Sequence, residues 1–222
     1  MNIAVILSAG SGKRFESEVP KQLLDLNGSQ IISYSLNKFQ NTDFIDSIIL
    51  VSNKDYLEET KLLASSFSKV VDVIVGGERR QDSVFNALSW IKEHGVCKKV
   101  FIHDAARPLF TNELLVSLKL ASENNETVIP VIPLEDTVKR IKDGVVESTI
   151  DRKNIVRVQT PQVFDFAKLY DCYIEFPNKL NATDDAFIIE YFGEEVKIID
   201  GEKDNIKITY PDDIRLAEYI LK

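Results

Sequence analysis

A glycine-rich stretch near the start of the chain has the composition of a polyphosphate-binding loop. Gly10 and Gly12 follow an apolar run at residues 3–7, and three cations come soon after them: Lys13, Arg14 and Lys21. A glycine turn after a buried strand lets backbone N–H groups approach phosphate oxygens closely, and cations neutralise the phosphate charge. Residues 9–21 therefore predict a loop that binds the phosphates of a nucleotide.

This loop fits neither of the two commonest phosphate-binding motifs. A Walker A loop needs glycine five residues before the Gly-Lys pair and Ser or Thr after it, but Leu7 and Arg14 occupy those positions. A dinucleotide-binding fingerprint needs a small residue three positions after Gly12, where the chain has Phe15. Taken alone, the loop could also be a plain strand-to-helix turn with solvated charges.

Two further polar segments follow predicted strands. Residues 76–83 come after the apolar run at 70–75, and residues 104–108 come after the run at 99–103. Because ligands bind at the carboxyl ends of parallel strands, we expect these segments and the first loop to form one composite site. Its cations suit phosphate, and they are Lys13, Arg14, Lys21, Arg79, Arg80 and Arg107.

Three residues of this composite site allow more than one role. Asp104 ends a strand with no cation immediately beside it, and a carboxylate near a triphosphate is well placed to hold Mg²⁺. The alternative is a turn or helix-capping aspartate. Asp82 or Ser83 could hydrogen-bond a sugar, or could cap the helix that begins there.

The two histidines offer little catalytic chemistry. His94 and His103 have no obvious neighbours that complete a metal site or a Ser-His-Asp triad. We interpret His103 as a packed strand residue. Phosphoryl transfer does not need a histidine base, because positioning and charge stabilisation can carry the reaction.

Strand and helix patterns alternate along the chain. Apolar runs predict strands at residues 3–8, 48–51, 70–75, 99–103, 127–132, 196–199 and 206–208. Helical patterns occupy residues 31–40, 55–67, 81–93, 112–123, 166–176, 183–192 and the segment from 211 onward. This alternation predicts one α/β domain over residues 1–222, with a mostly parallel twisted sheet and helices on both faces.

The alternation breaks between residues 133 and 160. Apolar residues are scattered among charges there, and Asp143-Gly144 is a turn signal. The pattern predicts a β-hairpin or arm that leaves the main sheet. An irregular surface loop is the alternative, although an excursion of this length usually has a function.

Charge and composition narrow the class of protein. The formal net charge of −8 argues against general affinity for nucleic acid or an anionic membrane, but not against one phosphorylated ligand. Cys97 and Cys172 form neither a metal-ligand spacing nor a disulfide framework. The first apolar run is too short to span a membrane, and no basic segment precedes it. We expect a cytoplasmic protein.

Several motifs together resemble one enzyme family. In chain order they are AGSGKRF, VPKQ, GGERRQDSV, HDAARP, DTVKR, DRKNIVRVQTPQ, TDDA and DNIKIT. This series, which runs from residue 3 to the C-terminal helix, resembles the cytidylyltransferases that make 4-diphosphocytidyl-2-C-methyl-D-erythritol in the non-mevalonate isoprenoid pathway. The resemblance implies a Rossmann-like nucleotidyltransferase fold and a homodimer joined by an arm at about residues 134–158.

The resemblance also implies a reaction and a set of residues. The phosphate of 2-C-methyl-D-erythritol 4-phosphate would attack the α-phosphorus of CTP, and pyrophosphate would leave with Mg²⁺ held by Asp104. Arg14 and Lys21 would stabilise charge in the transition state. The implied substrate-binding residues are Ala9, Gly10, Ser11, Gly12, Gly77, Arg80, Ser83 and Ala105.

The sugar phosphate would be bound and aimed by residues from two parts of the chain. Lys207 lies near the C-terminus, whereas Thr137 and Arg152 lie in the expected arm and would serve the neighbouring subunit's site. By this resemblance, Arg152 and Lys207 join Arg14 and Lys21 as catalytic residues.

Two other functions compete with this interpretation. Ribitol-5-phosphate cytidylyltransferase shares the fold and the CTP chemistry, but residues 104–108 and the basic pair at the end of residues 136–140 favour methylerythritol phosphate. A non-catalytic nucleotide-binding domain would keep the glycines, yet it would not need Lys21, Asp104, Arg152 and Lys207 together.

Overall fold

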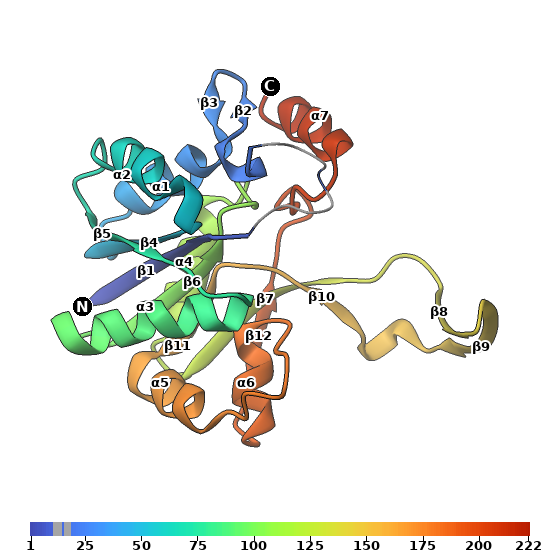
Figure 1. Cartoon of the computed structure of the whole chain (residues 1–222). Coiled ribbons are helices and arrows are strands. Elements are labelled where there is room, and N and C mark those ends of the chain that lie inside the picture. The colour runs from blue at the N-terminus through green and yellow to red at the C-terminus, as the bar shows by residue number, and fades with distance from the viewer. Residues whose placement is uncertain (11–14, 16–18) are drawn as a thin grey trace.

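The computed structural model describes residues 1–10, 15 and 19–222, and its centre is a mixed, mostly parallel sheet (Figure 1). The strand order is β10-β7-β11-β6-β1-β4-β5, and β12 also pairs with β7. The strands are β1 (Asn2–Ser8), β4 (Ser47–Ser52), β5 (Val70–Val75), β6 (Lys99–Asp104), β7 (Thr127–Pro133), β10 (Val156–Val158), β11 (Gln162–Asp165) and β12 (Lys197–Asp200). Parallel pairing joins β1 to β4 and β6, and β4 to β5, which confirms the predicted sheet.

Helices cover both faces of this sheet, as predicted (Figure 1). Ile3 and Val5 of β1 pack on one face, and Ala4 and Ile6 pack on the other, because successive side chains of a strand alternate. The first face carries α3 (Arg80–His94), α5 (Phe166–Glu175) and α6 (Asp185–Tyr191); the second carries α1 (Ile31–Gln40), α2 (Leu57–Ala64) and α4 (Asn112–Ala121). A 3-10 turn at Lys54–Tyr56 precedes α2.

The helix α3 shows why these elements form where they do. Val84, Ala87, Leu88 and Ile91 recur at helical spacing, and all four are fully buried against the sheet. Their burial confirms the amphipathic helix predicted at residues 81–93. Across the described part of the chain, we find no helix with the length and apolar character that a membrane span requires.

A third, smaller core lies beside the second face. It joins the hairpin of β2 (Asp25–Leu26) and β3 (Ser29–Gln30) to α7 (Pro211–Ile220), through Leu26, Ile31, Ile208 and Ala217. The strand predicted at residues 206–208 is wrong, because no strand forms there. Instead the Ile208 N–H donates to the carbonyl oxygen of Ala106 at 2.8 Å, so this segment pairs with the turn after β6.

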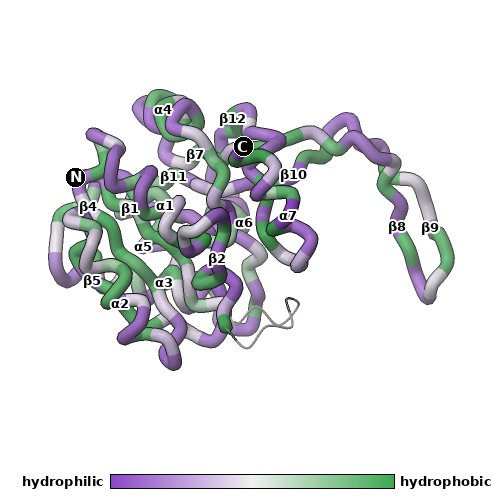
Figure 2. The backbone as a smooth tube through the Cα atoms, turned by 90° about the horizontal axis from the view of Figure 1, so that it is seen from above, coloured by the Kyte–Doolittle hydropathy of each residue, from purple (hydrophilic) through white to green (hydrophobic). Residues whose placement is uncertain are grey.

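The predicted hairpin arm is present. β8 (Val138–Lys142) and β9 (Val145–Ile150) pair in an antiparallel manner around Asp143 and Gly144, both at positive φ. The hairpin projects well away from the body of the molecule in two perpendicular views (Figures 1 and 2). After a 3-10 turn at Arg152–Asn154, β10 returns to the main sheet beside β7.

Candidate active site

A pocket of about 520 Å³ lies where β1, β4, β5 and β6 end. The sequence predicts the contributions that follow β1, β5 and β6. The register aligns Leu7 of β1 with Asp104 of β6, and Ser52 of β4 with Val75 of β5, so the strand ends are level. The pocket lining brings together nine of the predicted residues, namely Ala9, Gly10, Lys21, Gly77, Arg79, Arg80, Ser83, Asp104 and Lys207.

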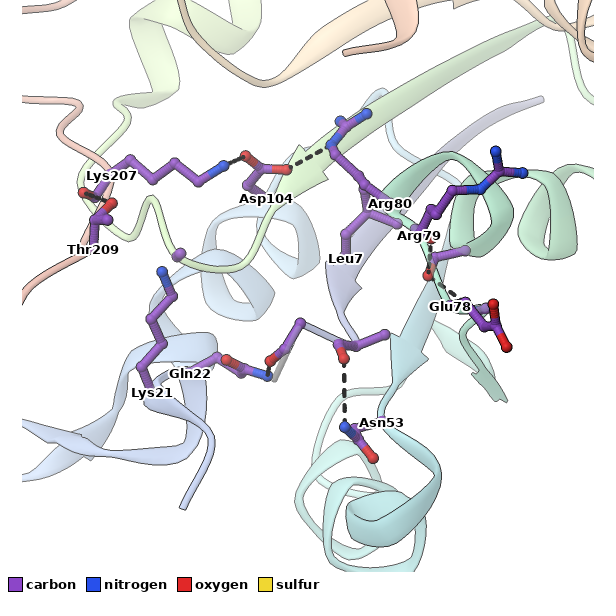
Figure 3. Close-up of a pocket in the computed structure, with 15 residues that line it drawn as sticks. Leu7, Lys21, Gln22, Asn53, Glu78, Arg79, Arg80, Asp104, Lys207 and Thr209 are labelled. Atoms are coloured by element: carbon purple, nitrogen blue, oxygen red, sulfur yellow. Dashed lines mark hydrogen bonds and ion pairs between the residues drawn. The ribbon is translucent and has the colours of Figure 1, made fainter. Parts of the chain in front are cut away.

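The start of the first loop is held by two amide side chains (Figure 3). The buried Gln22 side chain donates through Nε2 to the carbonyl oxygens of Ser8 and Gly10, and Asn53 Nδ2 donates to the carbonyl oxygen of Ala9 at 3.5 Å. These hydrogen bonds satisfy the three carbonyl groups and hold the backbone of residues 8–10 in place. The predicted residues Ser11, Gly12, Lys13 and Arg14 lie outside the described residues.

Lys21 reaches the pocket from the 3-10 turn that follows the first loop, Lys21–Leu23. Its ammonium group donates to the carbonyl oxygen of Ile208, in the segment that precedes α7. Lys21 and Lys207 therefore approach the pocket from neighbouring parts of one wall, although they are far apart in sequence.

The second polar segment packs closely against the first. A Cβ atom on Gly76 would lie 2.3 Å from Ala9 Cβ and 2.8 Å from Ser83 Oγ, so only glycine fits there. The Gly77 N–H donates to Ser83 Oγ at 3.1 Å. Asp82 caps α3 by accepting from the Arg79 N–H at 3.0 Å, which confirms one of its two possible roles.

Asp104 lies in an ion-pair network at the back of the pocket (Figure 3). Its Oδ2 contacts Lys207 Nζ at 2.6 Å, and its Oδ1 contacts Arg80 Nε at 3.2 Å. Arg80 Nη2 in turn lies 2.8 Å from Oδ2 of the buried Asp185. No cation adjoins Asp104 in the sequence, but the fold brings two cations to it from distant parts of the chain.

The charges of this network fix its protonation. Burial alone would raise the pKa of Asp104, but the positive charges of Arg80 and Lys207 lower that pKa well below its usual range. Burial would lower the pKa of Arg80, whereas Asp185 and Asp104 raise it above its ordinary value. Asp104 is therefore an anion, and Arg80 a cation, at any physiological pH.

His103 is a packed strand residue, as interpreted from the sequence. It is fully buried, and its ring nitrogens lie 3.1 Å from Thr160 Oγ1 and 3.2 Å from Ser35 Oγ. Burial lowers the pKa of His103 to about 3. A neutral, enclosed imidazole of this kind does not act as a base toward a ligand in the pocket.

Some predicted residues lie outside the pocket lining. Ala105 is buried in the core, and Thr137 and Arg152 are exposed in the arm. Arg107, which the sequence groups with the phosphate-binding cations, instead donates to the carbonyl oxygens of Asn205 at 2.9 Å and Val158 at 3.3 Å. Burial lowers the pKa of Arg107, and its contacts brace the base of the arm.

Sequence reasoning missed several residues of the site. Gln22, Asn53, Glu78 and Thr209 line the pocket without having been singled out. Gln22 carried a signal, since a glutamine directly after Lys21 in a loop next to an apolar strand can bind backbone carbonyl groups. Asp185 was also missed. It lies in the TDDA motif and does not line the pocket, and its contact with Arg80 follows only from the fold.

The described residues contain no group of three or more His, Cys, Asp or Glu side chains that could hold a metal ion by themselves. Among the described residues that line the pocket, the carboxylates are those of Asp104 and Glu78. A cation bound there would need further oxygen ligands from a substrate.

Comparisons with known proteins identify the family. The IspD family model, described as 2-C-methyl-D-erythritol 4-phosphate cytidylyltransferase, matches residues 2–222. A protein of Clostridium kluyveri with that name is 40% identical over 227 residues, covering 100% of this chain and 96% of the relative. One from Caldicellulosiruptor bescii is 41% identical over 219 residues, covering 99% and 96%.

Solved structures agree with the sequence relatives. The structure of 4-diphosphocytidyl-2C-methyl-D-erythritol synthase from Anaerococcus prevotii has a TM-score of 0.86 and 31% sequence identity, covering 99% of this chain and 97% of the other. The corresponding cytidylyltransferase of Francisella tularensis has a TM-score of 0.84 and 32% identity, covering 99% of both chains. The chain therefore belongs to the 2-C-methyl-D-erythritol 4-phosphate cytidylyltransferase family.

Proposed function

We propose that this chain transfers CMP from CTP to 2-C-methyl-D-erythritol 4-phosphate and releases pyrophosphate. It is a nucleotidyltransferase by family. The observation that carries the proposal is the meeting of Lys21, Asp104 and Lys207 in one pocket at the strand ends. An anionic acceptor and a triphosphate need cations near the reacting phosphorus, and Lys21 and Lys207 would supply two of them.

CTP would bind against the backbone of the first loop and the start of α3. Ala9, Gly10 and Gly77 offer close approach there, and Ser83 lies beside the Gly77 N–H. Lys21 would stabilise the charge that develops on the triphosphate, together with Arg14, for which the structure gives no placement. Ser11, Gly12, Arg80 and Ala105 remain predicted substrate-binding residues on the same basis.

Mg²⁺ suits the donor set of the pocket. This ion usually binds through one or two carboxylates together with substrate phosphates, and Asp104 offers one carboxylate beside the proposed triphosphate position. When bound, the ion would neutralise charge on the departing pyrophosphate. Asp104 is suited to this role because its neighbours keep it ionised.

The acceptor phosphate would be held partly by a second subunit. Lys207 lies in the pocket, whereas Thr137 and Arg152 lie in the arm and do not line the pocket of their own chain. We therefore propose one domain over residues 1–222 that dimerises through residues 134–158 and lends these two side chains to its partner. A cytoplasmic location remains a prediction.

The test is pyrophosphate release from CTP and Mg²⁺ by the purified protein. We expect release with 2-C-methyl-D-erythritol 4-phosphate at a higher kcat/KM than with ribitol 5-phosphate. Faster turnover of ribitol 5-phosphate would replace the proposed acceptor. Tight CTP binding in calorimetry, with no release for either acceptor, would instead indicate a non-catalytic nucleotide-binding protein.

A further inference from the structure

The side chain of Arg80 connects the pocket to the buried carboxylate of Asp185, at the start of α6. Its Nε contacts Asp104 at 3.2 Å, and its Nη2 contacts Asp185 at 2.8 Å. Asp185 comes from the first turn of α6 and is fully buried. Tyr173 of α5 donates its hydroxyl to Asp185 Oδ1 at 2.6 Å, so two helices behind the pocket hold this carboxylate.

We propose that Asp185 is a positioning residue of the active site, which acts through Arg80 on Asp104. This inference rests on the proposed function of the pocket. Asp185 does not line the pocket, and Arg80 is the residue that connects it to Asp104. The role of Asp185 is to hold the Arg80 guanidinium so that Nε faces Asp104, and to balance the positive charge of that guanidinium.

The charge balance supports this role. Asp104 and Asp185 carry two negative charges, and Arg80 and Lys207 carry two positive charges. Apart from this ion pair, neither Arg80 Nη2 nor Asp185 Oδ2 has a hydrogen-bond partner among the described residues. A buried charge without its partner is strongly unfavourable, so loss of the Asp185 charge would draw the guanidinium toward Asp104.

The helix-capping role at the start of α6 is already filled by the neighbour of Asp185. Asp184 is the N-cap of α6 and accepts from the Phe187 N–H at 3.1 Å. It also accepts from Gln162 Nε2 at 2.8 Å, and no hydrogen bond or ion pair joins it to Arg80. Asp184 therefore provides a matched control at the adjacent position.

The experiment is a double-mutant cycle on Asp185→Asn and Arg80→Gln. We expect Asp185→Asn to lower kcat/KM for CTP by about tenfold or more, and to add almost nothing in the Arg80→Gln background. Mn²⁺ binding in the presence of CTP, followed by electron paramagnetic resonance, should weaken in Asp185→Asn. Asp184→Asn should lower the melting temperature while kcat/KM and Mn²⁺ binding stay near the wild-type values.

Two outcomes would overturn the inference. One is a lower melting temperature in Asp185→Asn with wild-type kcat/KM and Mn²⁺ binding; the other is full additivity with Arg80→Gln. If Asp185→Asn does not fold, Tyr173→Phe keeps the test open, because it removes the hydroxyl that orients Asp185 and should give a smaller loss of the same kind. Wild-type protein without activity would refute the proposed function instead.

Discussion

His103 and Asp104 are neighbours in β6 with opposite electrostatic surroundings. Alternation along the strand points them to opposite sides, so Asp104 meets Arg80 and Lys207, whereas His103 meets the neutral hydroxyls of Thr160 and Ser35. The fold thus keeps the Asp104 carboxylate charged and the adjacent His103 imidazole neutral. Thr160 links them, because its Oγ1 also accepts from the Asp104 N–H at 3.1 Å.

The neutral state of His103 predicts how stability depends on pH in metal-free buffer. Its pKa is about 3 in the folded protein and near 6.5 when unfolded, so the unfolded state binds more protons between these values. His103 should therefore reduce the free energy of unfolding by about 1.4 kcal/mol per pH unit as the pH falls below 6.5.

The measurement is denaturant unfolding between pH 7 and pH 4, together with imidazole nitrogen NMR of the two histidines. His94→Gln assigns the spectrum, because His94 is exposed. A His103 resonance that titrates near pH 6 in the folded protein would contradict the prediction.

Lys21 provides the sharpest test of a single charge in the pocket. If its ammonium group stabilises the transition state, Lys21→Ala should lower kcat by about a hundredfold or more, which is ~3 kcal/mol. The melting temperature and circular dichroism should show an intact fold. Turnover close to the wild-type value would remove Lys21 from the catalytic set.

At the scale of elements, hydrogen bonds from side-chain amides hold residues 202–205, in the segment before α7. The buried Gln159 donates to the carbonyl oxygens of Glu202 at 2.7 Å and Asn205 at 3.1 Å, and it accepts from the Glu202 N–H at 3.0 Å. Asn205 is fully buried and donates to the carbonyl oxygen of Thr160 at 2.9 Å. These bonds set the path of the chain that presents Lys207 to Asp104.

Gly201→Ala should disturb the hydrogen bonds of the Gln159 amide. Its Cβ would lie 2.4 Å from Gln159 Oε1, and moving that amide breaks buried hydrogen bonds. We expect a loss of about 1–3 kcal/mol in the free energy of unfolding and a higher KM for the sugar phosphate. Gly95→Ala is the control, because its added Cβ meets nothing within 4 Å. Equal effects of the two substitutions would refute this explanation.

The sequence predicts those elements whose residues pack by a regular local period. The helix at Val84 to Ile91 and the strand at residues 3–8 are examples. The antiparallel β11 escaped prediction because it is short and contains the buried polar Gln162. Residues 206–208 alternate as a strand does, but the backbone there pairs with a turn.

The site shows the same limit. Glycines and cations that follow predicted strands can be recognised from the local sequence. Most of the pocket lining was therefore predicted. The ion-pair network of Asp104 could not, because its other members come from three separate segments of the chain: Arg80 and Lys207 contact Asp104, and Asp185 contacts Arg80. Only the topology of the sheet decides that these segments meet.

At the scale of the whole molecule, the arm is exposed on almost all sides. Ile141, Val145 and Val146 are each more than half exposed, and β8 and β9 contact each other away from the main sheet (Figure 2). Apolar side chains on a projecting hairpin favour association with another chain. The proposed dimer would cover them and carry Arg152 to the partner's pocket.

Mixing two inactive variants tests this exchange. If each site combines Lys21 of one chain with Arg152 of the other, a mixed dimer of Lys21→Ala and Arg152→Ala contains one intact site. An equal mixture should then recover about a quarter of the wild-type activity after subunit exchange. The measurement is pyrophosphate release, with exchange followed by native mass spectrometry.

The control mixes Lys21→Ala with Lys207→Ala. Both residues line the pocket of the same chain, so every site of their mixed dimer carries a defect. This mixture should stay inactive. Recovery in the control, or none in the first mixture despite confirmed exchange, would count against the shared site.

The small core formed by Leu26, Ile31, Ile208 and Ala217 ties together the segments that carry the two pocket lysines. Lys21 stands just before that core on one side, and Lys207 stands within the segment that enters it on the other. Limited proteolysis between Ile208 and α7 should therefore loosen the wall of the pocket that carries both lysines, while the main sheet keeps its own packing.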